Sequence, residues 1–415
     1  MPNHVEPPGW FAGDPHVHRG ILCDRTSAQN MLTPAELLDM MRPNNLAILS
    51  VLADSGNGEA KDADTDLAVI SGEDHPASTP QRIVHWDSEW HYDPKGNAVE
   101  RKVIGGHLIL LGLKHGGKPW AEYTYPIIEW AREQGAIAGF AHMQDLAQDG
   151  VPNGLTCCHP LEYPVETALG ASSFLMEDVG GSDAAVKAYY RLLNCGFRPG
   201  LAAGTDYPCN FSKPLGTLLT YVNVKGETLN YRDWIAGIAQ GRTVISRNAH
   251  QEFLELTVNG TASPGDDVPL DAAGTVSVRA RWTSMDKLTG QIELVQNGQV
   301  VAKLDGAAAP GRPLVLESKV AFTQSGWVCA RRMGAKSHAT HTAAVFVTVA
   351  HAPVRASSAD AEFFVRWCDN LIRKTSPGGP WNKYFSHDLA AAQQRYVKAR
   401  EVFRTVAMQA RAQGR

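Results

Sequence analysis

The sequence contains no apolar run of the roughly 20 residues that a membrane-spanning helix requires. Its seven cysteines are odd in number and include no C-x-x-C pair, which argues against a disulfide framework and against a thiolate zinc site. The first residues, MPNHVEPPGW, lack the basic and then apolar layout of a secretory signal peptide. We therefore expect a cytoplasmic protein that does not associate with a membrane.

The chain also lacks a strong excess of charge of either sign. Its 39 basic and 43 acidic residues give a net charge of −4, so electrostatic attraction to nucleic acid is not expected. Hydrophobic residues make up 44% and charged residues 20%, as in ordinary globular proteins. With 415 residues the chain is long enough for two domains and an appendage. We therefore expect a small molecule, and not nucleic acid, as the binding partner.

Within residues 1–250, short apolar runs alternate with helical patterns, which predicts an α/β fold with mainly parallel strands. The expected strands are 10–18, 46–54, 82–90, 107–113, 136–142, 171–179, 199–206 and 217–224. Thr33-Pro34-Ala35-Glu36 has the N-cap, proline and glutamate of a helix start. Further helices are expected over 119–134, 183–195 and 231–240, each followed by a glycine.

The pattern changes at residue 251. Helical periods give way to alternating strands, and Asn297-Gly298 between two such strands predicts a tight hairpin. Residues 251–350 are expected to form a small antiparallel β-domain of the sandwich type. Residues 351–415 are expected to be helical, over 359–373 and 387–412, and would either mediate a homodimer or pack on the first domain.

Histidines and carboxylates recur at the ends of the expected strands. His16 and His18 lie one residue apart in GDPHVH, so a strand directs both to one face. The other residues of these types at strand ends are Asp54, Glu89, His107, His142 and Asp206. Each alone is more often a structural hydrogen-bonding residue, but the joint pattern favours a site for zinc, manganese or iron(II).

The same motifs carry a family resemblance. GDPHVH, a glutamate in the third strand, GHLILLG, AH after a strand and AGTD resemble the polymerase-and-histidinol-phosphatase (PHP) superfamily, and more narrowly its carbaryl-hydrolase-like metallohydrolases. QGRTVISRNAHQEFLELTVNGTASPGDDV, ELVQNGQVV and HTAAVFVTV extend the similarity over residues 9–350. The resemblance implies a distorted (β/α)7-type barrel, followed here by the small antiparallel β-sandwich-like domain and the C-terminal helices.

The resemblance also implies a ligand set. His16, His18 and Asp206 match the ligands of a first metal, Glu89 a bridging carboxylate, and His107 and His142 the ligands of a second metal. A third metal of the phosphatases needs an aspartate, for which Asp24 is available, and two histidines. Ser55 and Pro208 stand where those histidines would be. One or two divalent ions are therefore expected, and phosphatase chemistry is disfavoured.

The expected reaction is hydrolysis of a carboxylic ester, carbamate or amide of a small organic substrate by metal-bound hydroxide. Asp54 would hold the attacking water or merely support a ligand, and Arg19, Arg247 and His250 are candidates to stabilise the oxyanion. Trp86, Trp90, Trp120 and Tyr207 would line a pocket for an aromatic leaving group or belong to the core. The alternatives are a phosphoesterase and a non-catalytic binding protein that contains metal.

Overall fold

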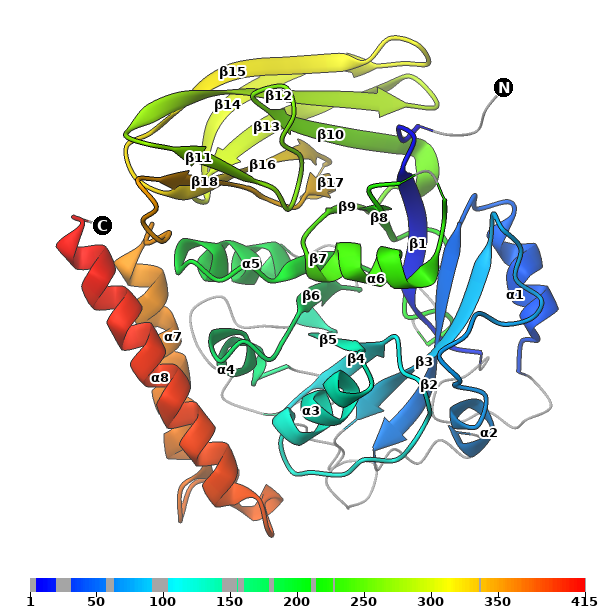
Figure 1. The fold of residues 1–415 in the computed structure, drawn as a ribbon, viewed down its shortest axis with the longest axis vertical. Helices are drawn as coiled ribbons and strands as arrows, with labels where there is room; N and C mark the ends of the chain where they lie inside the picture. Colours follow the sequence, from blue (N-terminus) through cyan, green and yellow to red (C-terminus); the bar gives the residue numbers. More distant parts are fainter. Residues whose placement is uncertain are drawn as a thin grey trace.

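The computed structural model describes residues 5–19, 31–56, 63–91, 104–143, 155, 160–178, 183–209, 214–226, 228–335 and 337–414. Figure 1 shows three parts: mixed strands and helices, a β-rich part formed by β10–β18, and a pair of long C-terminal helices along one side. Asp24 of the expected third-metal set lies outside the described residues.

The first part contains nine strands and six helices within the described residues. The strands are β1 (Trp10–Val17), β2 (Ile48–Gly56), β3 (Ile83–His91), β4 (His107–Leu111), β5 (Ile137–Phe140), β6 (Phe174–Glu177), β7 (Gly200–Ala203), β8 (Leu219–Asn223) and β9 (Thr243–Ser246). The helices are α1 (Pro34–Met41), α2 (Ala63–Leu67), α3 (Tyr125–Glu133), α4 (Tyr163–Ala168), α5 (Ala184–Asn194) and α6 (Tyr231–Ala239). Each of the eight expected strands is present, and the capping box of Thr33 and Glu36 starts α1. Helix α3 begins six residues later than expected, with Pro126 in its first turn.

The prediction of a (β/α)7-type barrel is wrong. The strands belong to a mixed 15-stranded sheet, whose main path runs β11-β18-β16-β17-β9-β8-β1-β2-β3-β4-β5-β6-β7. Pairs β1–β2, β2–β3, β5–β6 and β6–β7 are parallel, but β3–β4, β4–β5, β1–β8 and β8–β9 are antiparallel. Apolar runs that alternate with helices predict where the strands are but not their directions. The direction of each strand depends on the connection that joins it to its neighbour in the sheet. The same sheet continues past residue 250, because β9 pairs with β17.

The β-rich part has two sheets. Its strands are β10 (Glu252–Val258), β11 (Asp267–Leu270), β12 (Gly274–Ser284), β13 (Leu288–Gln296), β14 (Gln299–Ala308), β15 (Leu314–Phe322), β16 (Gly326–Met333), β17 (His338–Thr342) and β18 (Val345–Val349). A three-stranded sheet, β10-β12-β15, and the extension of the large sheet share an apolar core that includes Leu256, Val278, Leu294 and Val347. The expected hairpin is present, with Asn297 and Gly298 both at positive φ between β13 and β14.

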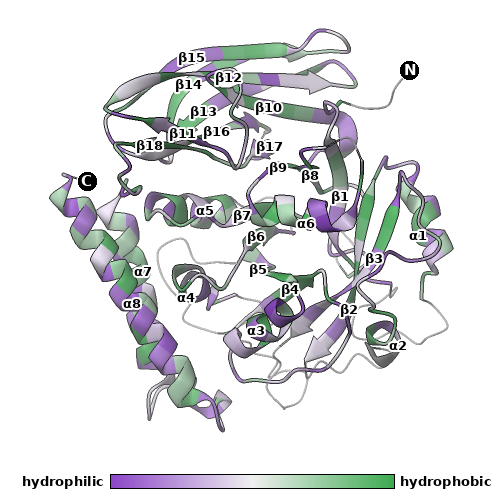
Figure 2. Ribbon diagram, in the orientation of Figure 1, coloured by the Kyte–Doolittle hydropathy of each residue, from purple (hydrophilic) through white to green (hydrophobic). Residues whose placement is uncertain are grey.

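Helices α7 (Ser358–Thr375) and α8 (Leu389–Ala412) pack together and carry both hydrophilic and hydrophobic residues, as Figure 2 shows. Helix α8 also attaches to the first part, where Tyr396 donates a hydrogen bond to buried Glu162 and Arg395 pairs with Glu166. Packing of these helices on the first part is therefore present, and a homodimer stays a prediction.

Among the described residues, no helix has the length and hydropathy needed to cross a membrane. The thiols of Cys195, Cys329 and Cys368 are free, whereas Cys209 is disulfide-bonded, which the sequence did not predict.

Candidate metal centre

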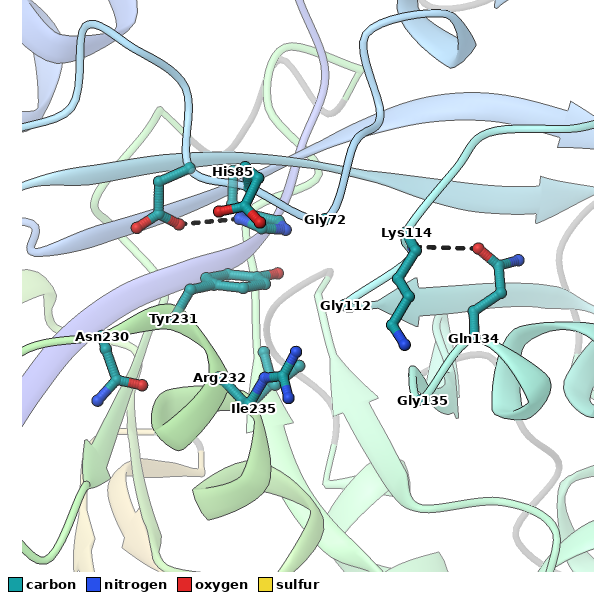
Figure 3. Close-up of a pocket in the computed structure, with 12 residues that line it drawn as sticks. Gly72, His85, Gly112, Lys114, Gln134, Gly135, Asn230, Tyr231, Arg232 and Ile235 are labelled. Carbon is teal, nitrogen blue, oxygen red and sulfur yellow. Dashed lines mark hydrogen bonds and ion pairs between the residues drawn. The ribbon is translucent and has the colours of Figure 1, made fainter.

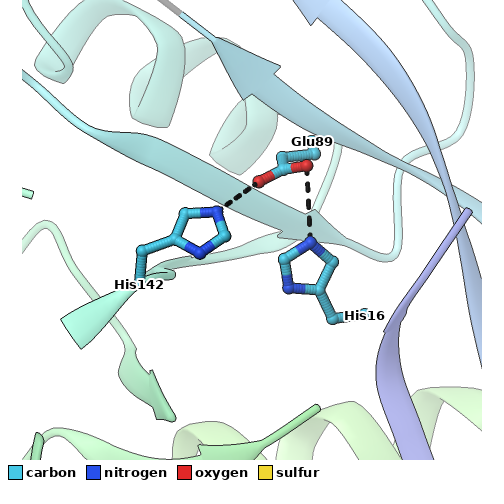
Figure 4. A group of neighbouring side chains, drawn as sticks. All are labelled: His16, Glu89 and His142. Carbon is cyan, nitrogen blue, oxygen red and sulfur yellow. Dashed lines mark ion pairs between the residues drawn. The ribbon is translucent and has the colours of Figure 1, made fainter. Parts of the chain in front are cut away.

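Glu89, on β3, is the centre of a buried cluster. Its Oε2 lies 3.4 Å from His16 Nε2 and 3.1 Å from His18 Nε2. Its Oε1 lies 2.9 Å from His107 Nδ1 and 3.4 Å from His142 Nε2. Figure 4 shows His142 next to one oxygen of this carboxylate and His16 next to the other. The two oxygens of one side chain therefore face two different pairs of histidines.

Each pair belongs to a compact group of donor atoms. Asp206 Oδ1 lies 3.3 Å from His16 Nε2 and 3.5 Å from His18 Nε2, which completes the first group. In the second group, His142 Nε2 lies 3.0 Å from His107 Nδ1. Donors about 2.0–2.1 Å from a tetrahedral zinc ion are about 3.3 Å apart, so both groups match the spacing around a cation.

Hydrogen bonding in the described structure supports the same interpretation. Both ring nitrogens of His16 and Nε2 of His18 are buried without a hydrogen-bond partner among the described residues. Such atoms are costly unless a ligand satisfies them. His18 Nδ1 lies 3.1 Å from the carbonyl oxygen of Leu52 and can donate to it, which leaves the Nε2 lone pair directed at Glu89 and Asp206. The residues present therefore fit a divalent metal.

Asp178 also belongs to the cluster, although the sequence did not single it out. It follows β6, is fully buried, and accepts a hydrogen bond of 2.7 Å from the backbone N–H of His142. Its Oδ2 also lies 2.9 Å from His142 Nδ1. The carboxylate thus fixes the tautomer of His142 and directs Nε2 toward Glu89. Its place directly after the apolar strand β6 was the available signal.

Asp14 precedes His16 by two residues on β1 and holds two parts of the cluster together through hydrogen bonds. It accepts hydrogen bonds from the backbone N–H of His16 at 3.1 Å and from Thr205 Oγ1 at 2.5 Å. Burial raises the pKa of Asp14 to about 7, although these hydrogen bonds oppose the shift. Thr205 precedes Asp206, so Asp14 links the strand of the first two histidines to the loop of the aspartate.

The carboxylates of the cluster affect the pKa values of its histidines. Burial opposes protonation of His18, but the charges of Asp54, Asp206 and Glu89 hold its pKa well above the usual range. Burial likewise opposes protonation of His142, yet Asp178 and then Glu89 raise its pKa. Protonation of these two rings would compensate the negative charge of the carboxylates. A divalent cation would provide the same compensation.

The cluster meets solvent on the side of Asp54 and Asp206. Their side chains are 16% and 14% exposed, whereas Glu89 is 2% exposed and His16 is fully buried. Asp54 Oδ1 lies 3.8 Å from His18 Nδ1, and Asp54 is opposite Glu89 in the register of β2 and β3. Asp54 therefore lies on the solvent side of the cluster, as a candidate for proton transfer.

Two of the expected oxyanion-stabilising residues lie elsewhere. The guanidinium of Arg19 is bound by Asp66 and lies over the ring of Trp86, 5.7 Å from its centroid. His250 contacts Tyr221 Oη at 3.1 Å and Glu6 Oε2 at 3.1 Å, near the start of β1. Sequence position alone could not reveal these partners, because each lies far away in the chain.

Arg247 does not belong to the cluster either, although its ion-pair partner is adjacent to Asp178 in the sequence. It pairs with buried Glu177, the neighbour of Asp178, and its Nη1 donates a 2.5 Å hydrogen bond to Ser337 Oγ. Trp86 and Trp90 belong to the hydrophobic core, in agreement with the packing alternative for these residues. Trp120, in contrast, is 48% exposed.

No protein-family model matches the chain, and no curated protein matches it in sequence. Among solved structures, the CARDB domain of PF1109 from Pyrococcus furiosus is 14% identical over 25% of this chain and 98% of that domain, with a TM-score of 0.18. A Jonesia denitrificans lytic polysaccharide monooxygenase is 17% identical over 22% of this chain and 61% of its own, with a TM-score of 0.16. An engineered protein is 15% identical over 74% of this chain and 78% of its own, with a TM-score of 0.17. These similarities are too low to bear on fold or function.

Proposed function

We propose that this protein is a metal-dependent hydrolase that cleaves a carboxylic ester, carbamate or amide bond of a small organic substrate. The observation that carries the proposal is the position of Glu89, whose two oxygens face two separate groups of histidine donors at 2.9–3.4 Å. A carboxylate shared in this way is typical of two-metal hydrolytic centres.

His16, His18 and Asp206 would hold one ion, His107 and His142 the other, and Glu89 both. Zinc, manganese and iron(II) suit this set of imidazoles and carboxylates. Bound ions would lower the pKa of water toward ~7 and polarise a carbonyl oxygen of the substrate.

The protein's own side chains supply orientation and proton transfer. Asp178 keeps His142 in one tautomer through its contact at Nδ1. Asp54, part exposed beside His18, would accept a proton from the attacking water and release it to the leaving group or to solvent.

Ester or carbamate chemistry is preferred over phosphate hydrolysis because of Ser55. This residue stands where a third-metal histidine is expected, is 3% exposed, and forms hydrogen bonds with Ser88 Oγ at 2.7 Å and the carbonyl oxygen of Glu89 at 3.3 Å. Its hydroxyl is thus engaged within the sheet. The resemblance to the carbaryl-hydrolase-like family, which remains a prediction, favours the same substrate class.

The test combines metal analysis of the purified protein with rates on an aryl ester, an aryl carbamate and an aryl phosphate. We expect one or two transition-metal ions per chain, turnover of the ester or carbamate, and loss of most metal or most activity in His18→Ala. His387→Ala is the matched control, because this histidine is exposed and its hydrogen bond to Glu122 is made by the backbone N–H, which alanine retains.

Four outcomes would contradict the proposal. Wild-type protein without transition metal, or His18→Ala with full metal and full rate, would remove the metal centre. Turnover of the phosphate alone would identify a phosphoesterase. Tightly bound metal without hydrolysis of any substrate would identify a non-catalytic metal-containing protein.

A further inference from the structure

A pocket lies toward the other end of β3 and β4 from the candidate metal centre. It has a volume of about 320 Å³, and His85, Lys114 and Arg232 are among the residues that line it. Figure 3 shows these three side chains around one space between β3, the end of β4 and the start of α6. His85 and Glu89 lie on the same face of β3, four residues apart, so the two sites are separated by about 13 Å of strand.

His85 is a fixed and buried polar group in the wall of this pocket. Its side chain is 4% exposed, and its Nδ1 lies 2.9 Å from Asp74 Oδ1. Its ring stacks on Tyr231, with 3.8 Å between centroids and 11° between planes, and the Tyr231 hydroxyl donates to buried Asp87. His85 Nε2 has no hydrogen-bond partner in the described part of the chain. A buried imidazole nitrogen without a hydrogen-bond partner is unfavourable unless a ligand atom satisfies it.

Two exposed cationic side chains, those of Lys114 and Arg232, line the same space. Lys114 and Arg232 project toward each other across the pocket in Figure 3, and no ion pair of either is found among the described residues. Arg232 is in the first turn of α6, where the side chain of Asn230 already accepts a hydrogen bond from the backbone N–H of Asp233. Two cations that line one space favour an anionic ligand.

The acidic residues of the pocket limit the size of that anion. Asp74 is engaged by His85, and Glu73 is exposed. Both would repel an extended polyanion, whereas one small anionic group between Lys114 and Arg232 would be attracted. With Nδ1–H donated to Asp74, His85 Nε2 can accept a hydrogen bond from a hydroxyl of the ligand.

We propose that this pocket is a binding site for a small oxyanion, either a phosphate or a carboxylate group on a small molecule. Lys114 and Arg232 bind the anionic oxygens, and His85 accepts a hydrogen bond from a protonated or hydroxylated position beside them. The site is independent of the metal centre and does not rest on the hydrolase assignment.

The experiment is calorimetric titration of the full chain with inorganic phosphate and, separately, with malonate. The protein is first treated with a chelator, so that neither anion can bind through a metal. We expect saturable binding of at least one anion, and the tighter of the two identifies the ligand class. Lys114→Ala and Arg232→Ala should each weaken binding about 3- to 10-fold.

Matched variants separate this pocket from the rest of the molecule. Lys319→Ala removes an exposed lysine of β15 and should leave the affinity unchanged. His85→Phe retains a ring to stack on Tyr231 but lacks the nitrogens, and should weaken binding. The proposal is overturned if neither anion saturates the protein below about 10 mM. It is also overturned if Lys114→Ala and Arg232→Ala bind as the wild type does while His18→Ala does not, since the anion would then occupy the metal-type cluster.

Discussion

The substitution Glu89→Gln tests the metal centre most directly. It keeps the size of the side chain but replaces the carboxylate that lies 2.9–3.4 Å from nitrogens of four histidines. A neutral amide cannot bridge two cations as a carboxylate does, so each group of donors would lose a ligand. We expect the metal content to fall by at least one ion per chain.

The expected magnitudes follow from burial and charge. Glu89 is 2% exposed, and removal of one partner from a buried charge network costs about 3–5 kcal/mol in the metal-free protein. Metal in 1,000-fold excess over its Kd adds about 4 kcal/mol to the stability of the wild type, a gain that the variant should largely lose. Changes that only orient a ligand cost 10- to 100-fold in activity, so loss of the bridging ligand should cost about 100-fold or more.

The assay measures thermal unfolding with and without chelator, metal content, and the rate on the best ester or carbamate. Glu122→Gln is the matched control, because Glu122 is also buried but accepts hydrogen bonds only from backbone N–H groups of residues 386–388 among its recorded bonds. The control should lose stability and keep its metal. If Glu89→Gln loses stability yet retains wild-type metal content and rate, Glu89 is a structural hydrogen-bond acceptor and the reasoning fails.

Three further predictions concern the surroundings of the cluster. Asp178→Asn should weaken metal affinity about 10- to 100-fold by releasing His142 from its tautomer, as measured by chelator competition, and unchanged affinity would refute this role. Although burial opposes it, buried histidine and arginine partners lower the pKa of Glu177 from 4.5 to about 2, so its contribution of about 3 kcal/mol should be present above pH 4.5 and lost as the pH falls toward 2. Urea unfolding of wild type and Glu177→Gln should therefore differ at pH 6 and converge at pH 2, and a constant difference would contradict the shift. Arg19→Ala and Asp66→Ala should each lower stability without additivity and leave the rate within about threefold, whereas a large loss of rate in Arg19→Ala alone would restore its catalytic role.

The sequence was informative wherever a short pattern determines local structure. Short apolar runs identified eight of the nine strands of the first part, and Asn297-Gly298 identified the hairpin, because positive φ at both positions is a property of those two residues. The sequence was less informative about which strands pair and in which direction they run. The directions of β4 and β5 depend on long-range connections, and for this reason the expected barrel was wrong.

For the candidate site, the sequence by itself determined which residues have the right chemistry and that His16 and His18 share a face. Only the tertiary structure decided that Glu89 lies between two donor groups and that Asp178 orients His142. It also decided that Arg19 is bound by Asp66, 47 residues away in the chain. The physical reason is that strand periodicity acts over two residues, whereas hydrogen bonds and ion pairs depend on which distant segments the folded sheet brings within about 3 Å.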